Sequence, residues 1–245
     1  MDGFCRILSL SYRRLSPDEA KKTVLRAARA GEGLSVFTPG AAVAARAERE
    51  GHLLSLLQRG DLLLADGVGT RLAARLAGEG VLSVVRGIEL GESLLSAAAK
   101  EGLRVFFYGG KRGVAVRAAA AVRKKYPTLE IRCADGYGEN PARDILAFSP
   151  HLLFVCLGFP RQEAYIARYK DCFCCPCLGL GGSFDVWSGD LSRAPRALRR
   201  LGLEWLWRTA LEPKRAVRLL PLPLYFLRCA ATGMKKLLHK RQKGE

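Results

Sequence analysis

The chain lacks a long hydrophobic run. In its 245 residues the longest uninterrupted apolar stretch, Leu219 to Leu227, has nine residues and includes two prolines. A membrane-spanning helix needs about 20 apolar residues, so the sequence predicts no transmembrane segment. The first ten residues contain Asp2 and Arg6 and no apolar core, so we expect no secretory signal. Together these absences predict a cytoplasmic protein.

Motifs for several kinds of phosphate chemistry are also missing. The pattern G-x-x-x-x-G-K-[ST] of P-loop NTPases does not occur, and neither does the G-x-G-x-x-G fingerprint of dinucleotide oxidoreductases. No Asp-x-Asp pair is present to hold a divalent ion on a diphosphate. A diphosphate leaving group would then need cationic side chains and backbone N–H groups. Arginines are available near predicted loop ends and in the tail: Arg86, Arg161, Arg193, Arg208, Arg215 and Arg218.

A second, separate CxxC pair is absent, although the chain has eight cysteines. Without a secretory signal we interpret them as cytosolic thiols rather than disulfides. Four of them cluster between Cys172 and Cys177, which leaves two interpretations open. One is a zinc site, and the other, which the missing second pair favours, is a set of small buried residues in a strand. We therefore expect no metal site and no cofactor.

Positive charge is concentrated in the last fifth of the chain. Residues 193–245 hold 14 Lys/Arg and 3 Asp/Glu, a net charge of +11 out of +17 for the whole chain. Such a tail points to a local anionic partner. Its apolar patches with Trp and Tyr beside basic residues favour an interfacial helix on an anionic membrane surface. A solvated helix packed on the domain is the alternative, and no nucleic-acid-binding motif supports a third.

Short apolar runs alternate with helical segments over most of the chain, which predicts βαβ units and a parallel sheet. Strands are expected at Cys5–Leu10, Leu34–Thr38, Asp61–Ala65, Val81–Val85, Arg104–Tyr108, Leu129–Cys133, His151–Leu157 and Phe173–Leu180. Helices are expected from Ser16 to Ala30, Ala41 to Leu57, Thr70 to Ala77, Ile88 to Lys100, after Gly113 to Lys125, Pro141 to Phe148 and Ala164 to Tyr169. The first has a capping box formed by Ser16 and Glu19.

The predicted fold class is therefore α/β: a Rossmann-like open, largely parallel sheet with helices on both faces. We expect residues 1–192 to form this core and residues 193–245 to form a basic helical appendage. Nearly every strand ends in Gly, Pro or a polar residue. Since glycine lets backbone N–H groups approach a ligand and helix N-termini attract anions, these ends favour a phosphate-bearing ligand.

Asp66 lies at the centre of this prediction. It follows the apolar stretch Leu62–Ala65 and precedes Gly67, at the carboxyl end of a predicted strand, where open α/β sheets bind ligands. A free aspartate has a pKa near 3.9 and is a poor base unless its surroundings raise that value, as the apolar strand is expected to do. The alternative is that Asp66 only caps the following helix.

A series of short motifs occurs in a fixed order along the chain. They are Thr38-Pro39, Ala65–Gly69, Arg86-Gly87, Gly109-Gly110, Tyr126-Pro127, Gly136-Tyr137, Gly158–Glu163, Gly181–Asp185, Gly189, Arg193–Pro195, Gly202–Trp205 and Glu212-Pro213-x-Arg215. In this order they resemble the WecG/TagA/CpsF family of bacterial glycosyltransferases. The resemblance extends from about Arg6 to about Leu227.

The resemblance implies an inverting, metal-independent transfer of a sugar, often N-acetylmannosamine, from a UDP-sugar to a polyprenyl-diphosphate-linked sugar. This takes place at the inner membrane face, in cell-wall or surface polysaccharide synthesis. Asp66 is implied as the general base with Thr38 beside it, while Arg86 and Gln162 line the pocket. The appendage is implied to contact the membrane and to supply arginines for the diphosphate. The other candidate substrate-binding residues lie in the same motifs and in the appendage. They are Gly109, Gly110, Tyr137, Gly182, Phe184, Asp185, Arg208, Arg215 and Arg218.

Two positions depart from the family pattern. Family members commonly have Thr-x-Asn where this chain has Thr38-Pro39-Gly40, and Glu89 stands where Asp is frequent. Gly40 lacks an amide, which leaves open a different sugar, lower activity or a catalytically silent relative that binds nucleotide or lipid. A Rossmann-type redox enzyme is a further alternative. The sequence also leaves open assembly into a homo-oligomer.

Overall fold

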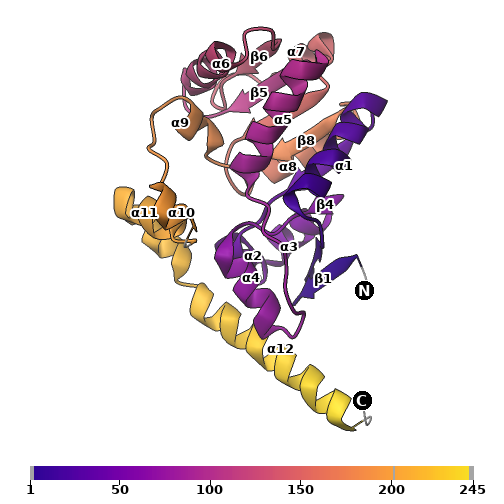
Figure 1. Ribbon diagram of the computed structural model, residues 1–245, viewed down its shortest axis with the longest axis vertical. Coiled ribbons are helices and arrows are strands. Elements are labelled where there is room, and N and C mark those ends of the chain that lie inside the picture. Colours follow the sequence, from indigo (N-terminus) through magenta and orange to yellow (C-terminus); the bar gives the residue numbers. More distant parts are fainter. Residues whose placement is uncertain (1–2, 201, 243–245) are drawn as a thin grey trace.

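The computed structural model describes residues 3–200 and 202–242. Its centre is a six-stranded, fully parallel sheet in the order β4-β3-β8-β7-β5-β6. Figure 1 shows this sheet behind the helices of one face. These strands are β3 (Leu34–Phe37), β4 (Leu62–Leu63), β5 (Val105–Gly109), β6 (Ile131–Ala134), β7 (Leu152–Cys156) and β8 (Pro176–Gly179). The predicted α/β class with a parallel sheet is confirmed.

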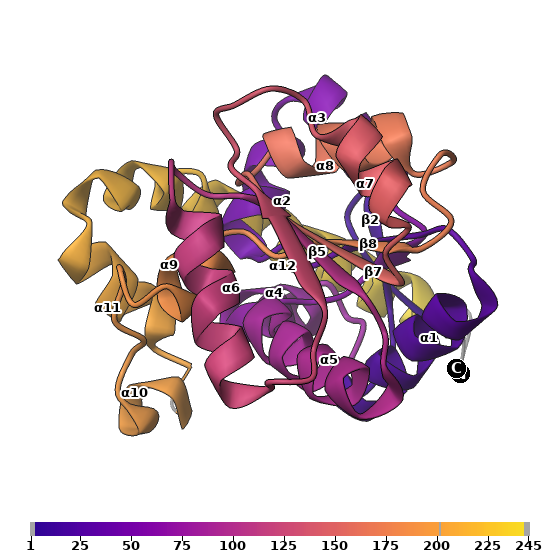
Figure 2. The same ribbon diagram turned by 90° about the horizontal axis from the view of Figure 1, so that it is seen from above.

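Helices cover both faces of the sheet (Figure 2). One face carries α2 (Ala41–Ala47), α3 (Gly51–Gln58), α7 (Ala142–Phe148) and α8 (Arg161–Tyr169). The other carries α1 (Pro17–Ala30), α5 (Gly87–Glu101), α6 (Val114–Lys125) and α9 (Ser183–Trp187). Alternation along the strands creates these two cores: Phe106 belongs to the first and its neighbour Phe107 to the second.

Two changes of direction in the strand order mark the carboxyl edge of the sheet. From β3 the chain proceeds outward to β4, whereas from the neighbouring β8 it proceeds to α9, which packs on α6. From β5 it proceeds to β6, whereas from the neighbouring β7 it returns to β8. In open α/β sheets, ligands bind where neighbouring strands diverge in this way. The topology therefore predicts a first crevice after β3/β8 and a second crevice after β5/β7.

The helix α1 begins and ends as its sequence predicts. Ser16 accepts a hydrogen bond from the Glu19 backbone N–H, and the Glu19 carboxylate accepts one from the Ser16 N–H at 2.8 Å. Gly31 closes the helix in the left-handed conformation, with φ of 65°. Such a capping box typically stabilises a helix by about 1 kcal/mol. This helix fixes the connection into β3.

The first predicted strand is wrong in its placement. Cys5 to Leu10 does not join the parallel sheet; instead β1 (Phe4–Ile7) and β2 (Leu10–Arg13) form a separate antiparallel hairpin. The turn between them includes Leu8 at a φ of 52°. The hairpin buries Ile7 and Tyr12 against the core beside β4, so it covers the edge of the sheet.

The predicted strand Val81–Val85 is also wrong, because this segment has no strand conformation. Arg14 of the hairpin connection donates hydrogen bonds to the carbonyls of Val81 and Glu79, at 3.0 and 2.7 Å. The Val81 carbonyl is one that a seventh strand would use for pairing. A bond from the Val85 N–H to the Ala65 carbonyl, at 2.8 Å, links the segment to the end of β4.

Two further predictions need correction. The predicted helix Ala41–Leu57 is two helices, since Glu50 takes an extended conformation between α2 and α3. The cysteine cluster is not one buried strand: Cys172 and Cys174 are exposed, whereas Cys175 and Cys177 are buried. Within the described ranges no three His, Cys, Asp or Glu side chains gather in a way that would hold a metal ion.

The tail is helical in its described part, residues 193–200 and 202–242. It forms α10 (Arg196–Arg200), α11 (Glu204–Leu211), the 3₁₀ helix η1 (Pro213–Leu219) and the long α12 (Leu222–Gln242). In Figure 1 α12 runs beneath α2 and α4 (Gly67–Leu76) and extends past them. Within residues 3–200 and 202–242, no helix is both long and apolar enough to cross a bilayer.

Candidate active site at the carboxyl edge of the sheet

Thr38 follows β3 directly and touches two other segments of the carboxyl edge. Its hydroxyl donates to the Gly179 carbonyl at the end of β8, at 3.5 Å. Gly87, the first residue of α5, lies so close that a Cβ there would be 2.8 Å from the Thr38 Oγ1. Because only a hydrogen occupies that position, the N-terminus of α5 can approach Thr38. The partly buried Thr38 therefore marks the centre of the first crevice.

Asp66 lies beside this centre, after the short strand β4. A parallel bridge pairs it with Gly40, two residues beyond Thr38. Asp66 occupies the residue before α4 in an extended conformation, but its side chain makes no capping hydrogen bond. The capping alternative is therefore wrong for the carboxylate, which is partly buried at the rim of the sheet. Its backbone carbonyl instead accepts a hydrogen bond from the Thr70 hydroxyl at 2.9 Å.

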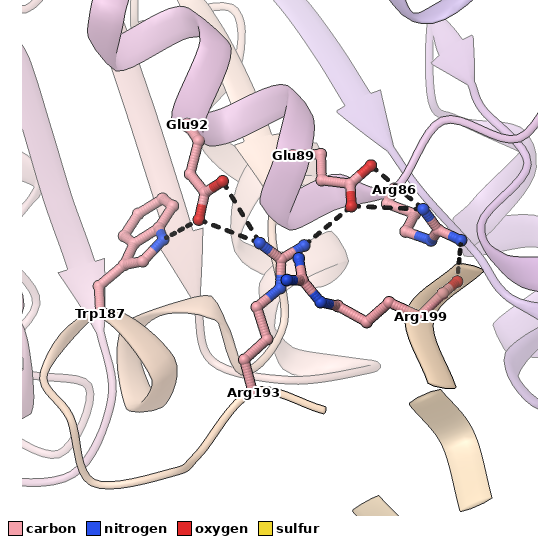
Figure 3. A network of polar contacts seen from close by, with 6 residues as sticks. All are labelled: Arg86, Glu89, Glu92, Trp187, Arg193 and Arg199. Atoms are coloured by element: carbon pink, nitrogen blue, oxygen red, sulfur yellow. Dashed lines mark hydrogen bonds and ion pairs between the residues drawn. The ribbon is translucent and has the colours of Figure 1, made fainter. Parts of the chain in front are cut away.

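Arg86 lies near the same edge, in the segment that leads from Val85 into α5. The Val85–Ala65 backbone bond places Arg86 at the start of α5, next to the strand end that carries Asp66. Its guanidinium bonds the Glu89 carboxylate at 3.3 Å and the Arg199 carbonyl at 3.0 Å. Figure 3 shows these contacts. Arg86 thus connects the candidate site to the appendage.

An ion-pair network extends from Glu89 along α5 (Figure 3). Arg193 bonds Glu89 at 2.9 Å and Glu92 at 3.4 Å, and Glu92 also accepts a hydrogen bond from the Trp187 indole. The Arg193 side chain is only 18% exposed. We counted Arg193 among the arginines available to a diphosphate; the structure instead pairs it with two carboxylates.

Gln162 lies in the first turn of α8, close to the end of β8. Its side-chain oxygen accepts a hydrogen bond from the Gly181 N–H at 2.9 Å, and its nitrogen donates to Glu163 at 2.9 Å. A Cβ at Gly179 would lie 2.9 Å from the same nitrogen. Since Gly179 also accepts the Thr38 hydrogen bond, Gln162 and Thr38 flank one residue of β8.

The second crevice holds the glycine loop after β5. The Gly110 N–H donates to the Cys156 carbonyl at 2.9 Å, and a Cβ at Gly109 would overlap that same carbonyl oxygen. With a φ of 135°, Gly109 has both the space and the backbone conformation of glycine only. The exposed Tyr137 ring packs under the Arg161 guanidinium, 5.1 Å from it.

The motif Gly181–Asp185 separates into two parts. Gly182 precedes α9 directly, and the Asp185 carboxylate lies over it, 3.2 Å from the position a Cβ would take. Phe184, which we expected to bind substrate, is fully buried and stacks on Phe107 with ring centroids 4.6 Å apart. That expectation is corrected: the Phe184 ring holds α9 against the sheet and does not line the site.

The appendage contacts the loop that carries Asp66. A Cβ at Gly202 would lie 3.0 Å from Val68, and one at Gly69 would lie 3.9 Å from the Phe226 ring of α12. The turn before α11 and the start of α12 therefore both lie on residues 68–69. Of the predicted appendage arginines, Arg218 is exposed on η1, while the side chains of Arg208 and Arg215 lie outside the described part of the structure.

Sequence reasoning missed Glu163, although it quoted the motif that contains it. The carboxyl group is 4% exposed, and one of its oxygens, Oε2, is buried without a hydrogen-bond partner. Burial raises the pKa of Glu163 to about 7, against the lowering effect of the Gln162 hydrogen bond. Helical spacing was the available signal: Glu163 shares its face of α8 with the buried Ile166 and Ala167.

Comparison with known proteins identifies the family of the chain. The family model described as "Glycosyl transferase WecG/TagA/CpsF family" matches residues 5–239. A protein of Bacillus subtilis (strain 168) named N-acetylglucosaminyldiphosphoundecaprenol N-acetyl-beta-D-mannosaminyltransferase is 36% identical over 202 residues, covering 80% of this chain and 78% of that relative. A protein of the same name from Staphylococcus aureus (strain NCTC 8325 / PS 47) is 30% identical over 187 residues, covering 74% of each chain.

Proposed function

The chain belongs to the WecG/TagA/CpsF family of glycosyltransferases, and on that premise we propose that it transfers N-acetylmannosamine or a related hexose. The donor is a UDP-sugar, and the acceptor is a sugar linked to polyprenyl diphosphate, in cell-wall or surface polysaccharide synthesis. The names of the two relatives support this choice of sugar and acceptor. The proposed transfer inverts the anomeric carbon and uses no metal ion.

The observation that carries the proposal is the proximity of four chain segments at one edge. Thr38, Asp66, Arg86 and Gln162 belong to four separate segments of the sequence, whose main chains lie around the ends of β3, β4 and β8. They include a carboxylate, a guanidinium and two neutral hydrogen-bonding groups. This combination suits a proton transfer next to a departing anion.

In the proposed mechanism Asp66 acts as the general base. Its carboxylate takes the proton from the acceptor hydroxyl as the oxygen attacks the anomeric carbon from the face opposite UDP. The bond between that carbon and the diphosphate oxygen breaks, and its electron pair leaves with UDP. General-base assistance of this kind is worth about 10²–10⁴ in rate. Thr38 lies beside Asp66 and is assigned to hold the reacting sugar.

The negative charge that develops on the diphosphate needs positive groups at the opposite side. We assign Arg86, the residue before the first turn of α5, to this role. Backbone N–H groups near Gly109, Gly110 and Gly182 are further candidates, because glycine allows a phosphate to approach the main chain closely. We assign Arg208, Arg215 and Arg218 of the appendage to the acceptor diphosphate.

The exposed side of α12 supports a peripheral position on an anionic membrane. One side of the helix packs on the domain, where Tyr225, Cys229 and Gly233 are buried. The other side exposes large apolar residues together with basic ones, including Leu224, Leu227, Met234, Lys235, Leu237 and Leu238. Each basic residue near an anionic surface contributes about 1 kcal/mol. Both sequence interpretations of the tail thus apply to different sides of one helix.

A donor screen tests the proposed reaction. Release of UDP from several UDP-sugars is measured with and without polyprenyl-diphosphate-linked N-acetylglucosamine. We expect release that depends on the acceptor, fastest with UDP-N-acetylmannosamine. UDP binding without transfer from any of the donors would overturn the proposal in favour of a silent relative.

Vesicle binding tests the membrane assignment separately. Sedimentation with vesicles of phosphatidylglycerol and phosphatidylcholine is compared for the full chain and for Leu237→Gln/Leu238→Gln, which alters only exposed residues of α12. We expect weaker binding of the variant and an unchanged melting temperature. Leu146→Gln, on the exposed side of α7, is the matched control. Equal binding of all three proteins would contradict the role of α12.

A further inference from the structure

Glu163 is a buried carboxyl group beside the site to which the mechanism assigns no role. It lies in the first turn of α8, is 4% exposed and leaves its Oε2 without a hydrogen-bond partner. Burying a carboxyl group with an unsatisfied oxygen costs free energy that an apolar side chain would not. We therefore expect the Glu163 carboxyl group to have a role other than stabilising the fold.

The Glu163 carboxylate is hydrogen-bonded to the Gln162 side chain. Its Oε1 accepts from the Gln162 Nε2 at 2.9 Å, while the Gln162 Oε1 accepts from the Gly181 N–H at 2.9 Å. The Gln162 amide is thus held at both ends. If it rotated by 180°, its oxygen would face a carboxyl oxygen and its nitrogen would face an N–H group. Glu163 and Gly181 together permit a single orientation.

The held amide lies directly against the centre of the site. A Cβ at position 179 would lie 2.9 Å from the Gln162 Nε2, so the amide is in close contact with Gly179. The Gly179 carbonyl accepts the hydrogen bond of the Thr38 hydroxyl. Gly181, on the other end of the amide, begins the turn into α9. An amide that lost its orientation would therefore disturb both main-chain segments that border Thr38.

We propose that Glu163 is a positioning residue for the transfer reaction: it holds the Gln162 amide in the one orientation that the donor sugar meets. This inference rests on the proposed function, because it is the proposed transfer reaction that assigns Gln162 to the donor sugar. Glu163 acts through Gln162 and does not itself touch the substrate. Its effect on the reaction must then vanish once Gln162 is gone.

A double-mutant cycle tests this dependence. The ratio kcat/KM for the UDP-sugar and the melting temperature are measured for wild type, Glu163→Leu, Gln162→Ala and the double variant. We expect Glu163→Leu to lower kcat/KM at least tenfold while the melting temperature stays equal or rises. In the Gln162→Ala background the same change should have no further effect on kcat/KM. Glu163→Met serves the same purpose should the leucine variant not fold.

Two companion variants separate positioning from packing. In Glu163→Gln the amide oxygen still accepts the bond from Gln162, so kcat/KM should stay within threefold of wild type. Ile166→Leu changes packing on the same buried face of α8 without a hydrogen bond and should leave kcat/KM unchanged. A Glu163→Leu variant with wild-type kcat/KM, or with a loss that adds in full to that of Gln162→Ala, overturns the positioning role.

The wild-type enzyme distinguishes this failure from that of the proposed function. If it transfers no sugar from any UDP-sugar, the transferase proposal falls and the positioning role is judged by binding alone. Calorimetry then compares the Kd for the UDP-sugars of the screen between wild type and Glu163→Leu. Weaker binding by the variant, with wild-type affinity in Glu163→Gln, supports the role of Glu163, and equal Kd values overturn it.

Discussion

Arg86 donates a hydrogen bond to the main-chain carbonyl of Arg199 across 3.0 Å, joining residues 113 positions apart in the sequence. Arg86 belongs to the carboxyl edge of the sheet, and Arg199 belongs to α10 of the appendage. The same guanidinium bonds Glu89, which is itself bonded by Arg193 (Figure 3). The position of the appendage and the conformation of a candidate site residue are therefore linked through a few polar contacts.

The first prediction concerns Arg193, which fastens the start of the appendage to α5. In Arg193→Gln the ion pairs with Glu89 and Glu92 are lost, so the segment around α10 should open more often. We expect the free energy of local opening to fall by about 1–2 kcal/mol, which speeds hydrogen exchange about 5–30-fold. Transfer activity should fall with it, because Arg86 loses its fixed partner. Hydrogen exchange followed by mass spectrometry measures the first effect.

Arg29→Gln is the matched control for this variant. It also breaks a two-pronged Arg–Glu pair with α5, formed with Glu101 at 2.8 Å, but it does so at the end of α5 remote from Arg86. We expect neither activity nor exchange in the appendage to change. Equal exchange in the two variants would show that Arg193 does not fasten the appendage.

The second prediction concerns the two aspartates at opposite ends of β4. Asp66→Asn removes the proposed base and should lower kcat by about 10²–10⁴ with little change in the melting temperature. Asp61 instead accepts hydrogen bonds from Ser35 and Lys170 at the start of the strand. Asp61→Asn should lower the melting temperature and keep most of the activity. Full turnover by Asp66→Asn would remove Asp66 from the mechanism.

The third prediction concerns Gly40, where the family commonly has Asn. Gly40 precedes α2 in an extended conformation with φ of −78°, and a Cβ there would lie 3.4 Å from the Asp66 carbonyl oxygen, an ordinary contact. Asparagine therefore fits, and as an N-cap it should add a few tenths of a kcal/mol of stability. Because its amide would lie next to Asp66, we expect Gly40→Asn to change the relative kcat/KM values of different UDP-sugars.

Gly51→Asn provides the comparison for that substitution. Gly51 begins α3, and a Cβ there would meet no atom within 4 Å. It should leave the preference among UDP-sugars as it is. If Gly40→Asn likewise leaves every ratio within twofold of wild type, the missing amide has no part in sugar selection.

Helices and strands that depend on neighbouring residues in the sequence were predicted correctly. The capping box of α1 and the apolar runs of the buried strands depend on neighbouring residues, and the structure confirms them. The failures depend on distant residues. Val81–Val85 has the composition of a strand, but Arg14 takes the carbonyls of Glu79 and Val81. No local pattern announces that contact, because its two sides are 65 and 67 residues apart.

For the candidate site, too, sequence patterns indicated positions in the fold but not contacts between distant residues. The position of Asp66 after β4 could be predicted because the topology of parallel sheets brings strand ends to one edge, while its role as a base stays a prediction. The interactions of Arg193 could not, since an arginine beside a predicted phosphate site and an arginine paired with Glu89 and Glu92 have the same sequence pattern. Phe184 was misplaced for a similar reason: a motif shows which residues occur together, and only packing shows which of them face inward.

The last prediction follows from the buried carboxyl group of Glu163. Burial raises the pKa of Glu163 from an ordinary 4.5 to about 7, despite the hydrogen bond from Gln162. The folded state therefore holds this proton more tightly than the unfolded state, and the resulting stabilisation is complete below pH 4.5 and is lost as the pH rises through about 7. The two pKa values correspond to a difference of roughly 3 kcal/mol.

Urea unfolding at pH 4.5 and pH 8 measures this contribution. Between these values the free energy of unfolding of wild type should fall by roughly 3 kcal/mol more than that of Glu163→Gln, which has no proton to lose. Glu32→Gln, which changes an exposed residue, should behave like wild type. If wild type and Glu163→Gln showed the same dependence on pH, the Glu163 carboxyl group would have to be equally ionised in the folded and unfolded chain, and burial would not be what governs its proton.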